Sequence, residues 1–572
     1  MILVFGGTTE GRKAAEVLEE AGTTYFYSTK TGEQELKLHH GVLRDGAMDE
    51  ETMLLFCREH EIRLIVDAAH PFALQLHETI AKMGLPVIRY ERIYPPRDAD
   101  ITWIDDYSQV PTDVHTLLAT TGVQSISRLK WLEERGVRVI YRILHRQSSI
   151  ELAYRQGATD DQLCYFEDGT MPKTDALLLK ESGMSGGFCE KVAAARARGM
   201  RIIAIKRPAL PTMFRQVNGP YGLRRAVEKL LPEFFPLKSG LTTGTCATAA
   251  AVAATTRLFY GNTPAEVPVL LPDGETIYVA VGYGDDYAYC IKEAGDDPDV
   301  TNGIEIRAQV KKANAFEIRG GEGVGRFTLP GFDFAPGEAA INKGPRAMMR
   351  QNIKEQVLVS ISVPNGEEIA RRTFNPRLGI EGGISIIGVS GIVKPFSEEA
   401  FISSIRKCME VAKASGSPRV VINSGAKSER FVRACYPDLP PQAFVEYGNY
   451  VGETLKMAAE LGFRQVTLGV MMGKAVKLAA GNLDTHSRRV VMDRQFVGQM
   501  LKEAGCSVNM TSLTLARELW TLVPERHLQS LVNVIIGHCM QHCGQLLPGG
   551  DLEILLISDE GQIMAKKKQP HD

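Results

Sequence analysis

Over the first 232 residues, short apolar runs alternate with amphipathic stretches. Such runs predict buried strands, and the stretches between them have the periodicity of helices. The predicted strands are Ile2–Phe5, Leu64–Asp67, Val87–Tyr90, Val137–Arg142, Ala176–Lys180 and Arg201–Ile205, and the predicted helices are Arg12–Ala21, Glu50–His60, Ala73–Met83 and Gly187–Arg198. This alternation is typical of α/β proteins with parallel sheets. We therefore expect two linked α/β lobes, each a doubly wound parallel sheet, at about residues 1–105 and 106–232.

The pattern changes after the short segment Pro232–Pro236. An Ala- and Thr-rich stretch predicts a helix from about Cys246, and Pro268–Val363 has the turn dipeptides of a β-rich region. Helical patterns return after Ser397, around the apolar runs Arg419–Asn423 and Gln465–Gly469. We expect the second half, residues 237–572, to be an α+β portion up to about residue 395 followed by an α/β portion at 396–572.

Composition and charge exclude several classes of protein. The chain has 572 residues with 66 Lys and Arg against 68 Asp and Glu, which argues against a polybasic nucleic-acid binder. No stretch reaches the ~18 apolar residues of a membrane span. Met1–Phe5 runs directly into Gly6-Gly7, as in a buried strand and unlike a signal peptide. We expect a cytoplasmic enzyme acting on small molecules, and the sequence leaves a homo-oligomer open.

The ten cysteines predict small core residues in a reducing compartment. One group stands apart, because a helix would place His538 over His542 and Cys539 over Cys543. Two such pairs could hold a metal. A partly buried helix end explains the same residues more simply, so we expect no metal site.

A glycine-rich loop, Gly6–Arg12, follows the first strand and opens the first helix. Backbone N–H groups at such a helix start can hold a phosphate. The Walker pattern fails because Arg12-Lys13 follow the last glycine, and the dinucleotide pattern fails because Thr8 stands where a glycine is needed. The loop is therefore either a phosphate-binding turn of unusual sequence or a tight strand–helix turn without a ligand.

Polar residues also follow two later strands. Asp67–Ala73 contains His70, and Lys180–Gly183 occupies the same place in the second lobe. Residues at the carboxyl ends of parallel strands line the ligand site of such folds. Three arginines near this edge, Arg89, Arg92 and Arg97, suggest an acidic substrate, although a structural histidine and a solvated basic face remain the alternatives.

Six strings of the first half, taken together, resemble the precorrin-6A reductase family of cobalamin biosynthesis: Gly6–Arg12, Asp67–Ala73, Arg89–Arg92, Thr120–Gly122, Lys180–Gly183 and Lys206–Pro208. The resemblance implies two Rossmann-like lobes with parallel sheets and a cleft between them. It also implies hydride transfer from NADH or NADPH to a double bond of the macrocycle. It places the cofactor at Gly6, Gly7, Thr8, Thr9 and Gly11 and the substrate at His70, Asp67, Arg89, Lys180, Ser182 and Arg207. His70 is the candidate catalytic residue.

Three further strings lie in the α+β portion. Gly240–Ala247 leads into a helix and could bind an anion, while Cys246 has no base near it in the sequence and fits a buried thiol better than a nucleophile. Lys292–Thr301 carries three aspartates around a proline, which without metal-binding spacing form either an exposed turn or carboxylates that raise one another's pKa. Gly320–Gly325 is not followed by a helix, so we expect a tight turn or a substrate-lining loop.

Long strings of the second half are similar to the cobalt-precorrin-5B C-1 methyltransferase family: Thr242–Ala247, Lys292–Thr301, Gly320–Thr328, Gly337–Asn342, Thr373–Ile380, Gly382–Ile386, Asn449–Gly452, Gly473-Lys474 and Thr485–Arg488. Family members often carry Gly-His before the Gly-Lys pair, whereas this chain has Val470-Met471-Met472. A role of that histidine is therefore absent or displaced here.

The second resemblance implies S-adenosyl-L-methionine as methyl donor, which we expect near Gly425, Asn449, Gly452 and Gly473. Asp296 or Asp299 is the candidate for moving protons on the macrocycle. His486, with Arg488, Lys474 and Arg377, would hold the substrate carboxylates, and Thr243 and Thr245 are further substrate-binding candidates.

Together the two resemblances imply one chain that methylates cobalt-precorrin-5B to cobalt-precorrin-6A and reduces that product to cobalt-precorrin-6B. The alternative is that only one half is catalytic and the other is a corrinoid-binding or assembly module. A generic short-chain reductase is disfavoured, because none of the 17 tyrosines has a lysine four positions later.

Overall fold

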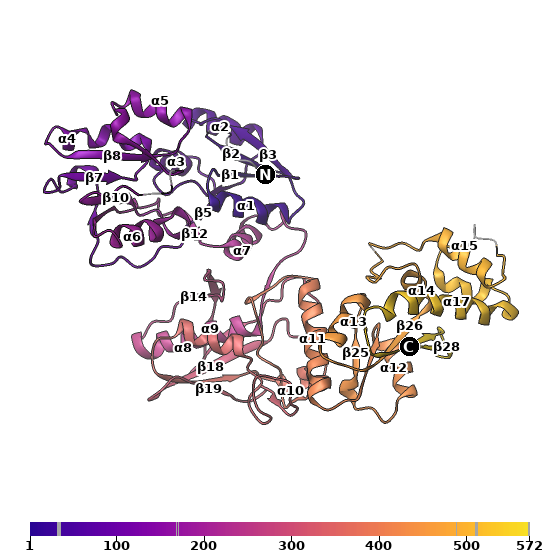
Figure 1. The fold of residues 1–572 in the computed structure, drawn as a ribbon. Coiled ribbons are helices and arrows are strands. Elements are labelled where there is room, and N and C mark those ends of the chain that lie inside the picture. Colours follow the sequence, from indigo (N-terminus) through magenta and orange to yellow (C-terminus); the bar gives the residue numbers. More distant parts are fainter. Residues whose placement is uncertain are drawn as a thin grey trace. The chain divides into compact units, whose positions relative to one another are not determined.

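The structure is a computed structural model, and it describes residues 1–30, 32, 36–167, 169, 171–487, 489–508 and 513–569. The chain forms two compact units (Figure 1). Unit 1 comprises Met1–Lys238 with Asp273–Tyr278, and unit 2 comprises Ser239–Pro272 with Val279–Asp572. None of the described helices combines the length and apolarity needed to cross a bilayer.

Unit 1 contains two parallel sheets. The first has the order β12-β5-β4-β1-β2-β3. Its strands are β1 (Ile2–Phe5), β2 (Tyr25–Thr29), β3 (Gly41–Asp45), β4 (Leu64–Asp67), β5 (Val87–Tyr90) and β12 (Arg215–Val217). Successive residues of β1 and β4 face opposite cores. Ile2 and Val4 pack with α1 (Thr9–Glu19) and α7 (Pro220–Leu230), and Leu3 and Phe5 pack with α2 (Glu50–Glu59) and α3 (Leu74–Ala81). This two-sided burial explains why these strands are continuous apolar runs in the sequence.

The second sheet has the order β6-β11-β10-β7-β8-β9 and the same two-sided burial. Its strands are β6 (Thr102–Ile104), β7 (Thr116–Ala119), β8 (Arg138–Ile143), β9 (Leu163–Tyr165), β10 (Ala176–Lys180) and β11 (Arg201–Ile205), with helices α4 (Lys130–Glu133), α5 (Gln147–Arg155) and α6 (Phe188–Arg196). The chain then returns to the first sheet, because β12 pairs with β5 and α7 packs beside α1. The predicted lobe boundaries imply that the chain passes once, from the first lobe to the second. In the structure the chain also returns to the first lobe, through β12 and α7.

The first part of unit 2 is built around α8 (Thr243–Tyr260), an Ala- and Thr-rich helix whose first nine residues are all buried. It packs on a mixed sheet of β16 (Gly282–Tyr283), β17 (Ala288–Ile291), β18 (Glu305–Lys312), β21 (Val357–Ser362) and β19 (Glu317–Gly320). The remaining elements are β13 (Gly240–Leu241), β14 (Glu266–Leu270), β15 (Thr276–Ala280), β20 (Arg326–Phe327), α9 (Lys343–Asn352), α10 (Gly366–Ala370), β22 (Ile380–Glu381) and β23 (Ile392–Val393), of which the first three residues of β15 belong to unit 1. The helix starts at Thr243, three residues before the predicted start.

The second part of unit 2 is an α/β sheet of order β25-β24-β26-β27-β28, parallel except for β28. Its strands are β24 (Arg419–Asn423), β25 (Phe444–Glu446), β26 (Gln465–Met471), β27 (Asp551–Ile557) and β28 (Ile563–Lys568). One face packs with α12 (Ala426–Cys435), and the other with α11 (Glu398–Ala414), α13 (Val451–Glu460), α14 (Met472–Ala479), α15 (Arg494–Glu503), α16 (Leu519–Leu522) and α17 (Glu525–Gly544). The predicted fold class, two parallel α/β lobes followed by α+β and α/β portions, is confirmed.

The glycines of the first loop are explained by a tyrosine of the neighbouring strand. A Cβ atom on Gly6 would lie 2.0 Å from the Tyr27 hydroxyl oxygen, and one on Gly11 would lie 2.5 Å from it. Tyr27 is buried, and its hydroxyl group accepts a hydrogen bond from the Gly7 N–H at 3.3 Å. The loop therefore needs small residues to accommodate its own tyrosine.

We predict that Gly6→Ala lowers the free energy of unfolding of unit 1 by about 2–3 kcal/mol, because the new methyl group would overlap Tyr27. The double variant Gly6→Ala/Tyr27→Ala should lose less unfolding free energy than the losses of the two single variants added together, because the methyl group no longer meets the tyrosine ring. Urea denaturation measures both. Gly498→Ala in α15, where a Cβ meets no atom within 4 Å, is the matched control and should cost nothing. Purely additive effects would show that Tyr27 does not impose the glycine.

Candidate functional site

In unit 2, three helices begin at the carboxyl edge of the α/β sheet. Gly425 is the N-cap of α12, while Gly452 and Gly473 lie in the first turns of α13 and α14. Asn449 lies just before α13, and its carbonyl accepts a hydrogen bond from the Thr485 N–H at 3.0 Å. The four residues predicted to surround the methyl donor thus share the edge at which parallel α/β sheets bind ligands.

Lys474, Thr485 and His486 lie at the same edge. The Lys474 ammonium group donates a hydrogen bond to the Gly448 carbonyl, and burial lowers the pKa of Lys474 to about 8. His486 is half-buried, and its N–H donates to Asp484 Oδ1 at 3.0 Å. Arg488, predicted to hold a carboxylate, lies outside the described residues.

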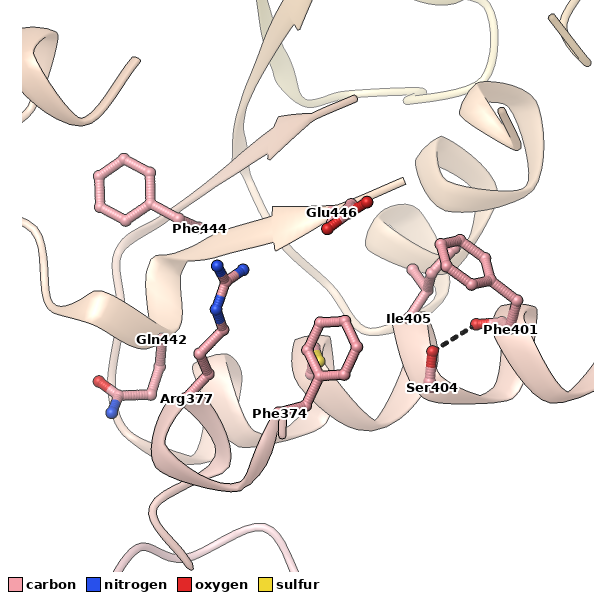
Figure 2. Close-up of a pocket in the computed structure, with 9 residues that line it drawn as sticks. Phe374, Arg377, Phe401, Ser404, Ile405, Gln442, Phe444 and Glu446 are labelled. Atoms are coloured by element: carbon pink, nitrogen blue, oxygen red, sulfur yellow. Dashed lines mark hydrogen bonds between the residues drawn. The ribbon is translucent and has the colours of Figure 1, made fainter. Parts of the chain in front are cut away.

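A pocket opens beside the end of β25 (Figure 2). Phe374 and Arg377 reach it from a 3₁₀ turn, Asn375–Leu378, and Phe401 reaches it from α11. The Arg377 guanidinium group pairs with Glu429 at 2.7 Å, so it is already neutralised by the protein. Glu446, the last residue of β25, lines the pocket and was not among the residues singled out from the sequence.

Burial raises the pKa of Glu446, while the charges of Arg377 and Lys474 oppose that rise. Cys408, on the pocket wall, has a pKa raised to about 11, chiefly by burial. Its thiol is therefore protonated at neutral pH and does not act as a nucleophile. The pocket offers aromatic surface and one carboxylate.

The hydroxyl groups of Thr243 and Thr245 serve the protein's own main chain. Thr243 Oγ1 accepts from the Ile387 N–H at 2.8 Å, and Thr245 Oγ1 donates to the Gly391 carbonyl at 2.6 Å. Thr242 is the N-cap of α8, accepting from the Thr245 N–H at 3.2 Å. Both predicted substrate residues are buried. Their sequence pattern is accounted for by the capping of α8 and its packing on the chain at 385–391.

The acidic turn Lys292–Thr301 contains one aspartate that is fixed in place. Asp299 accepts hydrogen bonds from Lys292 Nζ at 2.6 Å and from the Thr301 N–H at 2.8 Å. Burial alone would raise the pKa of Asp299, but Lys292 and Thr301 outweigh it and the pKa lies below its usual range. The expected mutual raising of pKa values is therefore wrong for Asp299. Asp296 is exposed on the same turn.

The cysteine–histidine group of α17 is divided between the core and the surface. Cys539 and Cys543 are buried, and Cys539 donates to the Ala475 carbonyl at 3.2 Å. His538 Nε2 lies 2.8 Å from the Glu503 carboxylate instead. Across the described residues, no three His, Cys, Asp or Glu side chains are grouped as a metal ion would require.

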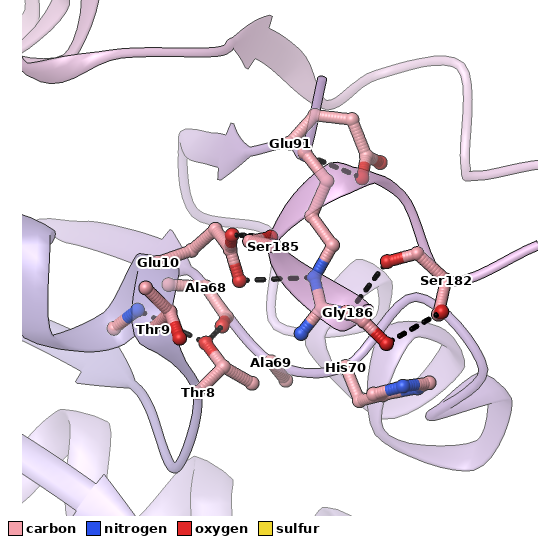
Figure 3. Close-up of polar contacts among 12 residues, drawn as sticks. Thr8, Thr9, Glu10, Ala68, Ala69, His70, Glu91, Ser182, Ser185 and Gly186 are labelled. Carbon is pink, nitrogen blue, oxygen red and sulfur yellow. Dashed lines mark hydrogen bonds and ion pairs between the residues drawn. The ribbon is translucent and has the colours of Figure 1, made fainter. Parts of the chain in front are cut away.

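In unit 1, the Gly6–Arg12 loop caps α1 and connects it to β4. Thr8 Oγ1 accepts from the Gly11 N–H at 3.0 Å and donates to the Ala68 carbonyl at 2.6 Å. Figure 3 shows Thr8 and Thr9 at this helix start beside Ala68, with Glu10 next to Ser185. The predicted cofactor residues thus lie where β1 and β4 end.

Glu10 joins the two parallel sheets of unit 1. Its carboxylate pairs with Arg92 Nε at 2.9 Å and accepts a hydrogen bond from the Ser185 hydroxyl group. Arg92 Nη1 also donates to the Ser182 carbonyl at 2.7 Å. Burial would raise the pKa of Glu10, but Ser185 and Arg92 more than compensate and the pKa lies below its ordinary value. The carboxyl ends of β1, β5 and β10 are therefore held together by a buried, charged network.

Asp67 and Arg89 belong to the support of this edge. Asp67 pairs with Arg89 Nη1 at 3.0 Å and with His77 Nδ1 at 2.8 Å, and Arg89 also contacts Glu91 at 3.3 Å. Neither Asp67 nor Arg89 has exposed surface. Both were predicted to bind substrate, but in this structure they contact protein groups behind the site.

His70 lies among cations. Burial lowers the pKa of His70 to about 3, with further lowering by Arg92 and Lys180. The Phe72 N–H donates to His70 Nδ1 at 3.2 Å, which leaves the hydrogen on Nε2 of a neutral ring. Burial also lowers the pKa of Lys180 to about 8, and its ammonium group lies 5.1 Å from the centre of the Phe72 ring.

Glu181, which follows β10, forms ion pairs with two arginines at the carboxyl edge of the second sheet. It pairs with Arg97 at 2.8 Å and Arg207 at 3.2 Å, and it accepts the Arg207 N–H at 2.9 Å. Arg207 also stacks on Tyr94, 3.7 Å from its ring centre. The Ser182 hydroxyl group donates to the Gly186 carbonyl at 3.1 Å. Of the predicted substrate residues in unit 1, His70, Lys180 and Arg207 keep surface that a ligand could reach.

We predict that Glu10→Gln opens the connection between the two sheets of unit 1, because Arg92 loses its buried counter-charge. Amide hydrogen exchange in α1 and over residues 182–192 should become faster, because the free energy of local opening falls by about 2–3 kcal/mol at pH 7. A carboxylate with a lowered pKa stabilises above its unfolded pKa of about 4.3, so the difference should vanish as the pH falls through the folded pKa. Glu16→Gln, an exposed position of α1, is the control. Unchanged exchange in Glu10→Gln would refute this role.

Comparison with known proteins assigns both units. A model of the precorrin-6x reductase CbiJ/CobK family matches residues 1–223, and models of CbiD and of the CbiD C-terminal domain match residues 232–395 and 484–568. The chain is 42% identical over 346 residues to the cobalt-precorrin-5B C(1)-methyltransferase of Prosthecochloris aestuarii, covering 56% of this chain and 94% of the relative. It is 40% identical over 351 residues to that of a Geobacillus species, covering 58% and 96%.

Two solved structures are also similar. The cobalamin biosynthesis protein cbiD from Archaeoglobus fulgidus is 31% identical, covers 44% of this chain and 83% of its own, and has a TM-score of 0.26. A CobK precorrin-6A reductase is 18% identical, covers 40% and 97%, and has a TM-score of 0.33. On the sequence matches, the chain belongs to the cobalt-precorrin-5B C(1)-methyltransferase family and carries a precorrin-6x reductase domain ahead of it, as in a bifunctional enzyme of cobalamin biosynthesis.

Proposed function

We propose that this chain performs two successive steps of corrin-ring synthesis. Unit 2 transfers a methyl group from S-adenosyl-L-methionine to C-1 of cobalt-precorrin-5B, and unit 1 reduces the resulting cobalt-precorrin-6A to cobalt-precorrin-6B with NADH or NADPH. The observation that carries the proposal is that both family matches are accompanied by a polar edge of parallel strands in their own unit. The alternative, a single catalytic half with a corrinoid-binding partner half, retains only one of these reactions.

For methyl transfer, the edge formed by Gly425, Asn449, Gly452 and Gly473 fits the donor, because helix starts and a pocket with aromatic walls meet there. S-adenosyl-L-methionine supplies an electrophilic methyl group when bound. The chain's residues hold the ring carbon in line with that group, and such positioning accounts for much of the rate. Lys474 and His486 are proposed to orient carboxylates of the macrocycle, while Arg377 is engaged by Glu429.

We assign the proton-moving role to Asp296. Asp299 is engaged by Lys292 and Thr301, so it fixes the shape of the turn, whereas Asp296 is exposed on that turn. A carboxylate at the surface can exchange a proton with the macrocycle or with water.

For the reduction, the start of α1 and the cations around His70 fit two anionic molecules. Reduced nicotinamide supplies a hydride when bound, and the first-turn N–H groups of α1 are suited to its phosphates. Gly6, Gly7, Thr8, Thr9 and Gly11 would line that part of the site. His70 offers an Nε2–H hydrogen bond from a neutral ring, while Lys180 and Arg207 offer positive charge to substrate carboxylates.

Product analysis by mass spectrometry tests both activities. With cobalt-precorrin-5B and the methyl donor alone, we expect one added methyl group, and with donor plus reduced nicotinamide we expect two further hydrogens. Asp296→Asn should slow methyl transfer about 100-fold yet still reduce cobalt-precorrin-6A supplied directly. A methylated product that gains no hydrogens with either NADH or NADPH would favour the alternative, in which unit 1 only binds corrinoid.

The pH dependence of the reduction tests Lys180. Its ammonium form predominates below about pH 8, so kcat/KM for cobalt-precorrin-6A should fall as the pH rises through 8. Lys180→Arg should flatten that fall because a guanidinium group stays charged. Lys180→Met should raise KM about 10- to 100-fold at pH 7 with little change in kcat. Lys173→Arg, at an exposed position, should leave the profile unchanged. A fall that persists in Lys180→Arg would assign the titration to another group.

A further inference from the structure

The chain order around the pocket of unit 2 is that of a nucleoside-binding unit. Strand β24 leads through Gly425 into α12, and the chain returns in β25, which pairs with β24 in parallel and ends at Glu446. In the strand order β25-β24-β26-β27-β28, the direction of the chain across the sheet reverses between β24 and β26, and β25 is the edge strand beside β24. In doubly wound folds, an acidic residue about 20 positions after the glycine turn hydrogen-bonds the ribose hydroxyl groups. Glu446 follows Gly425 by 21 positions.

The carboxylate and the glycine are close in space. A Cβ atom on Gly425 would lie 3.3 Å from Glu446 Oε1, so the missing side chain leaves that oxygen open to a ligand. Gly425 has a φ of 144°, a conformation that residues with side chains rarely adopt. The same geometry therefore both requires glycine here and exposes the carboxylate.

Glu446 differs from the neighbouring Glu429. The carboxylate of Glu429 is held by Arg377 at 2.7 Å and by Arg433 at 2.8 Å. Within the described part of the chain, Glu446 has no ion pair within 4 Å and no hydrogen-bond donor on its carboxylate. Arg377 and Lys474 act on this half-buried carboxylate through their charges alone, so at the wall of the pocket it suits a ligand that brings its own hydrogen-bond donors.

The mouth of the pocket offers an exposed aromatic ring on which a base can stack. Phe374 is 48% exposed at its mouth, where an apolar ring otherwise gains nothing from water. Phe401 and Phe444 add aromatic surface on the other walls (Figure 2). A planar heterocycle stacked on Phe374 would leave the attached ribose near the end of β25.

We propose that Glu446 binds the ribose diol of the adenosyl group of the methyl donor, with Phe374 supporting the base. The proposal rests on the proposed use of S-adenosyl-L-methionine and adds the residue that recognises its nucleoside. Glu446 accepts hydrogen bonds from both ribose hydroxyl groups, and no bond is made or broken at this residue.

Calorimetric titration of the full chain with S-adenosylhomocysteine, and with its 2′-deoxyribose analogue, tests the proposal. The unsubstituted protein should bind S-adenosylhomocysteine about 10-fold or more tightly than the deoxy analogue. Glu446→Gln should weaken S-adenosylhomocysteine about 10- to 100-fold and bind the two compounds nearly equally, because the lost contact is the one that distinguishes them. Glu460→Gln, whose side chain is 59% exposed in α13, is the matched control and should bind as the unsubstituted protein does.

Phe374→Ala provides a second variant that should not disturb folding, since this ring is half-exposed, and it should weaken both compounds by about 3- to 10-fold. If S-adenosylhomocysteine binds the unsubstituted protein but Glu446→Gln and Phe374→Ala bind it equally well, the nucleoside lies elsewhere and this inference is wrong while the proposed function stands. If the unsubstituted protein does not bind S-adenosylhomocysteine at all, both the inference and the proposed methyl donor are overturned.

Discussion

Parallel strand pairing determines where the polar chemistry of this protein gathers. Strands that run in the same direction end at the same edge, so residues far apart in the sequence meet there without any local motif. Asp67 and Lys180 end β4 and β10 in unit 1, and Asn423 and Glu446 end β24 and β25 in unit 2. Both candidate sites therefore have the same origin, although the units share neither sequence strings nor chemistry.

The edge in unit 1 is stabilised by buried charges, and this arrangement favours positioning over stability. Glu10, Arg92, Asp67 and Arg89 are nearly or fully buried. A buried ion pair often contributes little net stability, because desolvation offsets the attraction between the charges. It does fix side chains in one geometry. The network leaves His70 and Lys180 beside groups that cannot move freely, which suits a site that must orient a large anionic macrocycle.

The sequence predicts the fold better than the sites. The apolar strands Ile2–Phe5, Leu64–Asp67, Val87–Tyr90, Ala176–Lys180 and Arg201–Ile205 are predicted at the residues where they occur, because two-sided burial demands continuous apolar runs. The return of the chain through β12 is missed, since a three-residue strand with polar residues carries no such pattern.

The contacts of the buried candidate residues, and the place of Glu446, also have physical explanations that the sequence alone does not reveal. Thr243 and Thr245 follow a pattern that helix capping and anion binding share, and the sequence cannot separate the two. Arg89 has the charge of a substrate contact, but its burial depends on Asp67 and Glu91, which the fold brings to it. Glu446 stands alone at the end of a short strand, and only its pairing with β24 shows that it lies beside Gly425.

In our proposal, one chain both methylates and reduces the same corrinoid molecule. It is tested most directly by incubating the full chain with cobalt-precorrin-5B, a methyl donor carrying a trideuterated methyl group, and reduced nicotinamide deuterated at the transferable position. We expect a product whose mass shows both the trideuterated methyl group and the transferred deuterium in the same molecule. A product that carries only one of the two labels, with NADH and with NADPH, would contradict it.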